Sequence, residues 1–169
     1  SASGFSSVPV SSVIEVSKEN NAKKIPILLY HHLVSPEEKG KNGNSIIHTT
    51  TEFERQMKLL KENGYITVTT DDIVKYVKGE KYLPAKSVCI TFDDGYKSNA
   101  YYAAPILRKY GFCATVFTIT KYLDLPDEKY NTKKNMVDFQ YVSYKDIEKT
   151  SDVLSYQCHT NDLHKKLIE

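Results

Sequence analysis

Short apolar runs alternate along the chain with segments whose apolar residues recur at helical spacing. Runs of this kind are typical of buried strands, and they predict strands at residues 25–30, 65–69, 88–92, 113–120 and 153–158. The helical spacing predicts helices at residues 51–62, 72–78, 97–110 and 144–150. Strands that alternate with helices are typical of an α/β fold around a parallel sheet, either open or closed.

Capping signals indicate where two of these helices begin. Thr51 and Glu54 have the spacing of a capping box, which predicts the start of the first helix. Thr70 and Asp71 predict the N-terminal cap of the second helix. A glycine follows each of the first three helices, as expected where the chain leaves a helix through a left-handed residue.

The composition and hydrophobic patterning of the chain change near residue 25. Residues 1–24 are rich in Ser, Val and Lys, lack helical periodicity, and predict a linker or tail. Residues 25–169 contain all the predicted strands and helices, and their length suits one domain or most of one. Within them, the polar segments 35–46 and 124–138 predict loops.

Charge and hydropathy argue against several classes of partner. The chain has 169 residues, with 23 Lys and Arg against 21 Asp and Glu, so the formal net charge is +2. This balance argues against a nucleic-acid groove, and we expect no nucleic-acid partner. No apolar run approaches the roughly 20 residues of a membrane-spanning helix, so we expect no membrane span.

The three cysteines do not suggest a disulfide framework or a structural zinc site. Cys89, Cys113 and Cys158 each lie in an apolar or strand-like run, and no Cys-x-x-Cys pair occurs. We therefore expect them to be buried free thiols.

Two neighbouring carboxylates follow the predicted strand 88–92. Asp93, Asp94 and Gly95 come at its carboxyl end, which is where ligands gather in parallel α/β folds. Adjacent carboxylates repel each other and need a cation or a shared proton. The alternative interpretation is an ordinary Asp-Asp-Gly turn, because these residues are favoured in turns.

Two histidines follow the predicted strand 153–158. His159 and His164 lie five residues apart, and two imidazoles with one carboxylate are a common ligand set for Zn²⁺. Ni²⁺, Co²⁺ and Fe²⁺ tolerate the same ligands. Asp162 would orient a histidine or cap a helix, and the alternative is that it is a further ligand. The alternative is a pair of unrelated surface histidines.

The two motifs together predict more than either alone. Both follow core strands at the same edge of the predicted sheet, so one carboxylate and both histidines complete a three-ligand metal site. The second carboxylate is then free to act as a base. His31 and His32 end the first strand, and one of them lines the cleft or is a structural histidine. We expect His48 to be exposed.

These motifs resemble those of the polysaccharide deacetylases, carbohydrate esterase family 4 with the NodB-homology domain. The Thr-Phe-Asp-Asp-Gly motif occurs at residues 91–95, and the second motif begins with His159 and Thr160. Its second histidine, His164, comes one residue later than in most members. That spacing, with the segment Leu-Leu-Tyr-His-His at residues 28–32, is similar to the branch that deacetylates poly-β-1,6-N-acetylglucosamine. The resemblance covers about residues 25–169.

The resemblance implies a role for each matching residue. Asp93 would be the general base, and the backbone N–H near Tyr96 would stabilise the oxyanion. Thr160 would support the histidine loop. A divalent cation, Zn²⁺ first among the candidates, would have three ligands: Asp94, His159 and His164.

The resemblance also implies the fold and the substrate. It implies a distorted (β/α) barrel of the polysaccharide deacetylase type, of which residues 25–169 would be the N-terminal portion. The remaining motifs, including a histidine that protonates the leaving amine, would lie beyond Glu169. The implied partner is an extracellular or cell-surface polysaccharide containing N-acetylglucosamine, and the protein would be exported. Alternatives are a peptidoglycan or chitin deacetylase, an acetyl-xylan esterase, a hydrolase of a non-sugar amide and a non-catalytic carbohydrate-binding relative.

Overall fold

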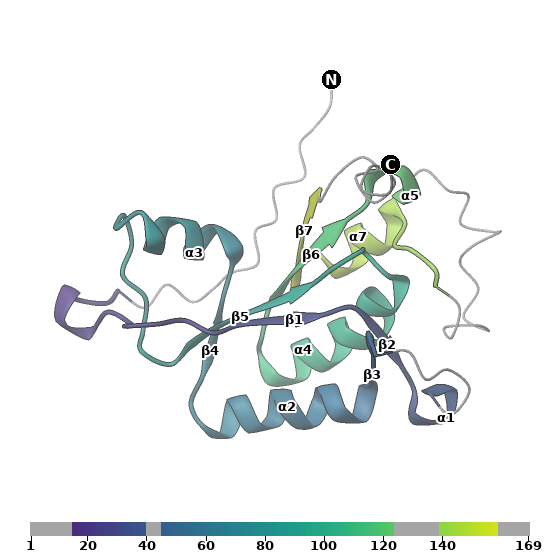
Figure 1. Cartoon of the computed structure of the whole chain (residues 1–169), viewed down its shortest axis with the longest axis horizontal. Coiled ribbons are helices and arrows are strands. Elements are labelled where there is room, and N and C mark those ends of the chain that lie inside the picture. Colours follow the sequence, from purple (N-terminus) through teal and green to yellow (C-terminus); the bar gives the residue numbers. More distant parts are fainter. Residues whose placement is uncertain (1–14, 40–44, 124–138, 159–169) are drawn as a thin grey trace.

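The centre of the molecule is a parallel β-sheet (Figure 1). The structure, a computed structural model, describes residues 15–39, 45–123 and 139–158. Neighbouring strands follow the order β1-β5-β6-β7, and β4 pairs with the start of β5. The strands are Ile27–Tyr30 (β1), Ile66–Val68 (β4), Ser87–Phe92 (β5), Ala114–Thr118 (β6) and Leu154–Cys158 (β7). The predicted α/β class with a parallel sheet is confirmed, and the sheet formed by the described strands is open.

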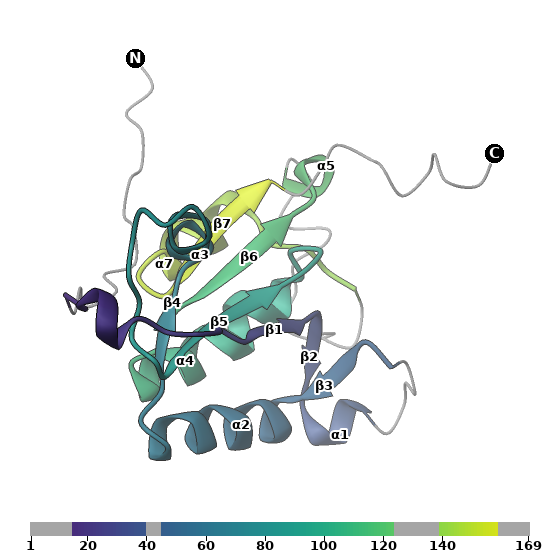
Figure 2. The ribbon, with the colours of Figure 1, turned by 60° about the vertical axis from the view of Figure 1, so that its left-hand side comes forward.

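Helices cover both faces of the sheet, as Figure 2 shows most clearly. Helices α2 (Thr50–Glu62) and α4 (Ala104–Tyr110) pack on one face, where their apolar side chains meet those of β5 and β6. Helix α3 (Thr70–Val77) covers the opposite face near the start of β5. Helix α7 (Tyr144–Thr150) lies beside β7, at the bounds that the sequence predicts.

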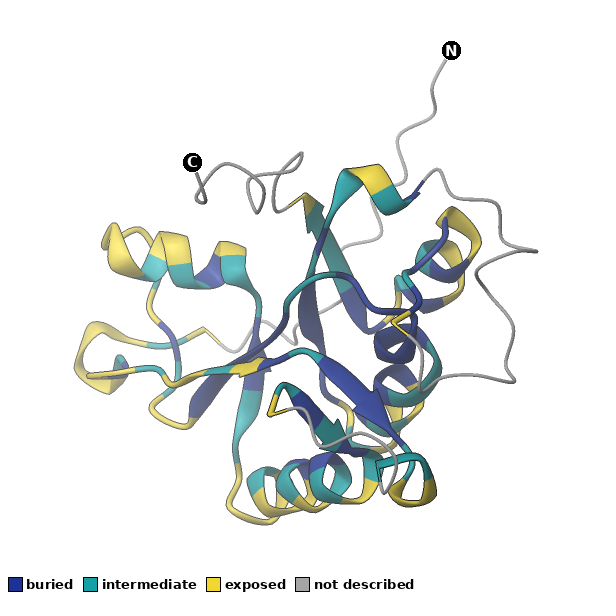
Figure 3. Ribbon diagram, turned by 45° about the vertical axis from the view of Figure 1, so that its right-hand side comes forward, coloured by how far each residue is buried: buried dark blue, intermediate teal, exposed yellow. Residues whose placement is uncertain are grey.

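Burial follows this layering (Figure 3). All six residues of β5 are buried, because a central parallel strand is covered on both faces. The edge strand β1 differs: Tyr30 lies in the core, whereas Ile27 and Leu29 are each more than half exposed. The carboxyl ends of all these strands meet at one edge of the sheet, which is where the first candidate motif lies.

Several short elements fall where the sequence predicts none. They are the 3-10 helix η1 (Lys18–Asn20), the helices α1 (Pro36–Lys39) and α5 (Thr120–Leu123), and the strands β2 (His32–Val34) and β3 (Ile47–Thr49). Strands β2 and β3 pair with each other in a separate small sheet. The predicted loop 35–46 lies between these two strands and contains α1. The expected exposure of His48 is wrong, because this β3 residue is half-buried with its ring edge against Tyr30.

The predicted caps of α2 and α3 are wrong by one or two residues. Thr49 caps α2: its side chain accepts a hydrogen bond from the Glu52 N–H, and the Glu52 carboxylate accepts one from the Thr49 N–H. Thr69 forms the same reciprocal pair with Asp72 at the start of α3. The Thr-x-x-acid spacing occurs twice near α2 and once near α3, where it begins at Thr69. In each case the preceding strand gives the capping threonine the extended backbone that a cap requires.

The predicted helix 97–110 is confirmed in its bounds, with residues 97 and 98 already helical, but it is not uniform. A π-helical turn, η2 (Asn99–Ala103), precedes α4. Pro105 explains the wider turn, because it has no N–H to donate to the carbonyl of Tyr101 and its ring crowds that carbonyl.

Other expectations have mixed outcomes. Cys89 and Cys113 are buried free thiols, but Cys158 is exposed at the end of β7, so the expectation of burial is wrong for that residue. In the predicted linker, Ala22 is buried and its N–H donates to the Leu83 carbonyl. No helix among the described residues is long and apolar enough to cross a membrane.

Candidate active site

The chain turns sharply where β5 ends. The N–H of Asp93 still donates to the Tyr30 carbonyl of β1 at 2.9 Å. The next two residues, Asp94 and Gly95, both have left-handed backbones, with φ values of 70° and 64°. A side chain at Gly95 would come within 3.1 Å of the Thr118 Cα, so glycine is required there for space as well as for conformation. This turn leaves both carboxylates at the carboxyl edge of the sheet.

Asp93 lies beside a histidine from the neighbouring strand. Tyr30 and Phe92 are partners in the β1–β5 register, so the residues that follow them, His31 and Asp93, come level with each other. The His31 Nε2 and Asp93 Oδ2 atoms are 3.9 Å apart, and each side chain is about one-quarter exposed. This distance is too long for a hydrogen bond but short enough for a protonated imidazole to interact with the carboxylate.

Asp94 lies beside a tyrosine whose ring is fixed in place. The Tyr96 hydroxyl donates to Asp94 Oδ2 at 3.3 Å, and the tyrosine is buried. Burial first, and then the Asp94 carboxylate, raise the pKa of the Tyr96 hydroxyl well above its usual range. Tyr96 therefore stays protonated and keeps its hydrogen for donation.

Two further tyrosines extend from Tyr96 as a stack. The ring centroids of Tyr96 and Tyr141 are 5.5 Å apart with planes 24° from parallel. Tyr122 stacks on Tyr141 at 3.9 Å and 13°. Burial, followed by the Tyr122 hydroxyl and the Asp94 carboxylate, raises the pKa of Tyr141 to about 12. Neither Tyr122 nor Tyr141 is predicted from the sequence, since nothing in their local sequence indicates that they meet.

The backbone after the turn is held by the segment that precedes α7. The Val142 N–H donates to the Gly95 carbonyl at 2.9 Å, and the Lys97 N–H donates to the Gln140 carbonyl at 2.7 Å. The side chain of Lys97 then forms a buried ion pair with Asp146 of α7, with 2.7 Å between Nζ and Oδ2. The residues on both sides of Tyr96 are thus anchored.

The two histidines of the first strand end have different surroundings. His32 is buried, and its Nδ1 lies 2.9 Å from the Ser98 hydroxyl. The backbone of His31 is held by Asn99, whose side-chain amide donates to the His31 carbonyl at 2.9 Å. The structure therefore places His32 in the core and His31 at the candidate site.

The other predicted site residues, His159, Thr160 and His164, lie outside the described residues. The strand that precedes them, β7, ends at Cys158 on the same edge of the sheet as β5, two strand positions away. Two strand spacings correspond to roughly 10 Å. Among the described residues, no group of three or more His, Cys, Asp or Glu side chains is arranged to hold a metal ion.

The carboxylates nevertheless suit a cation. Among the described residues, neither Asp93 nor Asp94 forms an ion pair with a lysine or arginine. Two adjacent, partly buried carboxylates without such a partner are stabilised by a bound cation, and a carboxylate oxygen with imidazole nitrogens is a common donor set for divalent transition metals.

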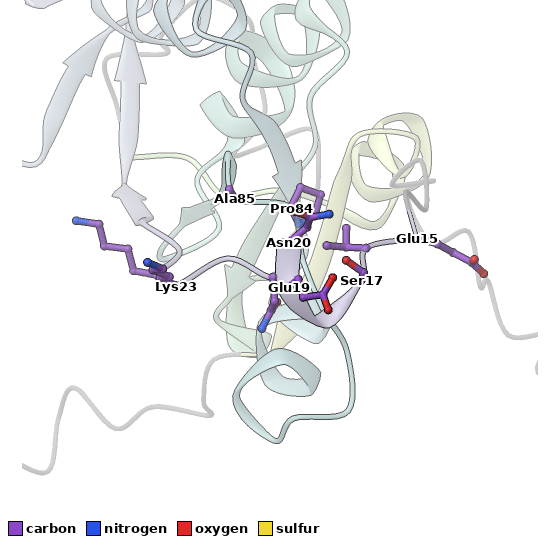
Figure 4. Close-up of a pocket in the computed structure, with 10 residues that line it drawn as sticks. Glu15, Ser17, Glu19, Asn20, Lys23, Pro84 and Ala85 are labelled. Atoms are coloured by element: carbon purple, nitrogen blue, oxygen red, sulfur yellow. The ribbon is translucent and has the colours of Figure 1, made fainter.

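A hollow of about 810 Å³ lies elsewhere in the molecule (Figure 4). Its lining comes from residues 15–24 and from Pro84 and Ala85, which precede β5. Asp93 follows the opposite end of this strand, roughly 20 Å away for six residues. The hollow is therefore separate from the candidate site.

Known proteins share the motif region of this chain. The family model described as polysaccharide deacetylase matches residues 80–161. YxkH of Bacillus subtilis is 42% identical over 104 residues, which are 62% of this chain and 35% of that protein. The poly-beta-1,6-N-acetyl-D-glucosamine N-deacetylase of Staphylococcus epidermidis is 29% identical over 144 residues, 84% of this chain and 46% of that protein.

Solved structures agree with these matches. The Streptococcus pyogenes deacetylase PplD, solved in complex with acetate, superposes with a TM-score of 0.66 at 29% identity, covering 82% of this chain and 57% of that one. The chain spans less than half the length of the Bacillus and Staphylococcus relatives. From the matched motif region, the sheet and these similarities, we conclude that the chain contains part of a polysaccharide deacetylase domain.

Proposed function

We propose that the chain carries the base and the cation-binding part of an enzyme that hydrolyses N-acetyl groups on an N-acetylglucosamine polymer. The observation that carries this proposal is the Asp93–Asp94 turn at the carboxyl edge of the parallel sheet, in a chain that contains part of such a domain. The product would be acetate and a polymer with free amines.

Asp94, together with His159 and His164, would hold a divalent cation. Zn²⁺ is the first candidate for these ligands, and Ni²⁺, Co²⁺ and Fe²⁺ also suit them. When bound, such a cation polarises the acetamide carbonyl and lowers the pKa of water.

Asp93 would take a proton from the attacking water, since its carboxylate is free of lysine and arginine partners among the described residues. The water oxygen then bonds to the carbonyl carbon. The Tyr96 N–H would stabilise the oxyanion. Tyr96 pairs with Tyr141 in an isolated β-bridge. The backbone hydrogen bonds of this bridge are made by the Gly95 carbonyl and the Lys97 N–H, on either side of the Tyr96 N–H.

The carbon–nitrogen bond breaks once the leaving amine receives a proton. The resemblance assigns that task to a histidine of a later family motif, and His31 is a second candidate. His31, at 3.9 Å from Asp93, is a partly exposed imidazole at the same site. We propose that it delivers this proton, a role for which histidine is the usual side chain.

The preferred substrate is poly-β-1,6-N-acetylglucosamine. The Staphylococcus epidermidis relative carries that activity in its name, and the spacing of His159 and His164 favours the same branch. Peptidoglycan, chitin and acetyl-xylan are the competing substrates. We expect the protein to act outside the cell or at its surface, because the polymer is found there.

Acetate release from a β-1,6-linked N-acetylglucosamine oligomer tests this proposal, with the natural polypeptide that contains this chain. Asp94→Ala should lose the divalent cation, whereas Asp93→Asn should keep it and lose most turnover. His31→Gln should lower kcat by about 10²–10⁴-fold. Asp71→Asn, an exposed carboxylate on α3, is the matched control and should behave as wild type.

Two outcomes would contradict the proposal. If wild-type protein binds no divalent cation and Asp94→Ala changes nothing, the site is not a metal site. If wild type binds the polymer and the cation but releases no acetate, the protein is a carbohydrate-binding relative.

A further inference from the structure

The proposed reaction uses the backbone N–H of Tyr96 but not the stacked side chains of Tyr96, Tyr141 and Tyr122. The three rings come from three separate segments: the turn after β5, the stretch before α7, and α5. They nevertheless form a continuous contact that ends at the Asp94 carboxylate, through the hydroxyl of Tyr96.

Tyr96 is held from several directions. Its ring lies 5.2 Å from His32 and 5.4 Å from Phe139, measured between ring centroids, in addition to its stacking on Tyr141. Its backbone is flanked by the hydrogen bonds of Gly95 and Lys97. Because the ring is held in place, its hydroxyl donates to the neighbouring Asp94 carboxylate from a fixed position.

Within the part of the chain that the structure describes, the Asp94 side chain has few other contacts that would fix its orientation. Its backbone has the left-handed conformation of the turn, and its partly exposed side chain has no lysine or arginine partner among the described residues. Of its two carboxylate oxygens, Oδ2 accepts the Tyr96 hydrogen bond. A hydrogen bond to one oxygen restricts rotation of the carboxylate and leaves the other oxygen directed elsewhere.

We propose that Tyr96 is a positioning residue that orients the Asp94 carboxylate toward the divalent cation, and that Tyr141 holds Tyr96 in place for this purpose. The inference rests on the proposed function, because it takes Asp94 as a cation ligand. Groups that hydrogen-bond to metal ligands commonly affect metal affinity by 10- to 100-fold.

The competing interpretation is that Tyr96 serves the core alone. Tyr96→Phe separates the two, since it keeps the ring and its packing but removes the hydroxyl. Tyr144→Phe is the matched control, because this tyrosine is 60% exposed at the start of α7.

The experiment is a Co²⁺ titration of the natural polypeptide that contains this chain, followed by visible absorption. We expect Tyr96→Phe to raise the Co²⁺ Kd about 10- to 100-fold and to alter the Co²⁺ absorption band, without changing the thermal midpoint of the metal-free protein. Tyr144→Phe should match wild type. Tyr141→Leu, which removes the stacked ring, should also raise the Kd.

A Tyr96→Phe protein with the wild-type Kd and absorption band overturns the inference. If Tyr96→Phe fails to fold, an unchanged Kd in Tyr141→Leu overturns it instead. Asp94→Ala in the same titration separates the two proposals. If Asp94→Ala loses Co²⁺ while Tyr96→Phe keeps it, only the positioning role fails. If Asp94→Ala binds as wild type does, the proposed function fails, and the inference with it.

Discussion

At the scale of single residues, the site depends on a backbone turn that few side chains tolerate. Asp94 and Gly95 are consecutive left-handed residues, and aspartate is one of the few non-glycine residues that adopt this conformation readily. The turn directs two carboxylates away from a buried strand, and conformations that cost free energy in this way are common at functional sites.

Gly95→Ala should therefore destabilise the fold and weaken the site together. The left-handed backbone costs alanine about 1 kcal/mol, and the clash with Thr118 adds about 1–3 kcal/mol. Gly79→Ala is the matched control, because Gly79 has a similar φ of 73° but no atom within 4 Å of the position that a Cβ would occupy. Thermal unfolding should show a clearly larger loss for Gly95→Ala, and equal losses would contradict the steric argument.

Residue-level patterns were sufficient to find Asp93 and Asp94, and they offered His31 and His32 as cleft residues without deciding between them, but they did not indicate Tyr141. The carboxylates are recognisable as an Asp-Asp-Gly sequence after an apolar run. His31 and Tyr141 reach the same site from 62 residues before Asp93 and 47 residues after Asp94, positions that only strand register and ring stacking bring together. The same register also separates His31 from the buried His32.

At the scale of elements, helix starts are decided by neighbouring strands. Strand β3 ends at Thr49, so the chain reaches α2 with an extended residue already in the capping position. The competing Thr51–Glu54 pair lies inside the helix. When a capping pattern occurs twice in the sequence, the structure of the preceding segment decides which copy forms the cap.

The cap assignment predicts a difference between two neighbouring threonines. Thr49→Ala should lower the free energy of unfolding by about 0.5–2 kcal/mol, because the Glu52 N–H loses its partner. Thr51→Ala, at an exposed position within α2, should change it little. Urea unfolding of both variants measures this, and an equal loss in each would contradict the assignment.

The buried ion pair between Lys97 and Asp146 ties the turn after β5 to α7. Lys97→Met should cost about 3–5 kcal/mol, because it leaves the Asp146 carboxylate buried without a counter-charge. The exposed pair of Lys58 and Glu62 provides the control, since Lys58→Met should cost less than about 1 kcal/mol. Denaturant titrations compare the free energies of unfolding of the two variants. Similar small losses would show that the buried pair contributes no more to stability than the exposed one.

At the scale of the whole molecule, the free energy of unfolding should decrease at acidic pH. Burial by itself would raise the pKa of Asp72, but hydrogen bonds from Lys81 and from the Thr69 N–H outweigh it and hold that pKa below its usual range. A pKa that is lower in the folded state gives stability above the unfolded pKa, and this stability is lost as the pH falls through the folded value.

We therefore expect the thermal midpoint to be nearly constant from about pH 7 to 5 and to fall below about pH 4, near the unfolded pKa of aspartate. Asp72→Asn should lower the midpoint at neutral pH and make its acid dependence shallower. The exposed neighbour Asp71 supplies the control variant Asp71→Asn. An unchanged acid dependence in Asp72→Asn would refute the assignment.

The amino-acid sequence by itself determined the α/β class, the alternation of strands and helices, and the carboxylates at the end of β5, because these follow from periodicity and from residues adjacent in the chain. Only the tertiary structure decided that His31 faces Asp93, that Tyr96 contacts Asp94, and that Thr49 rather than Thr51 caps α2. Those relations depend on register, stacking and the direction in which one element leads into the next. Residues distant in the sequence acquire such relations only when the sheet assembles.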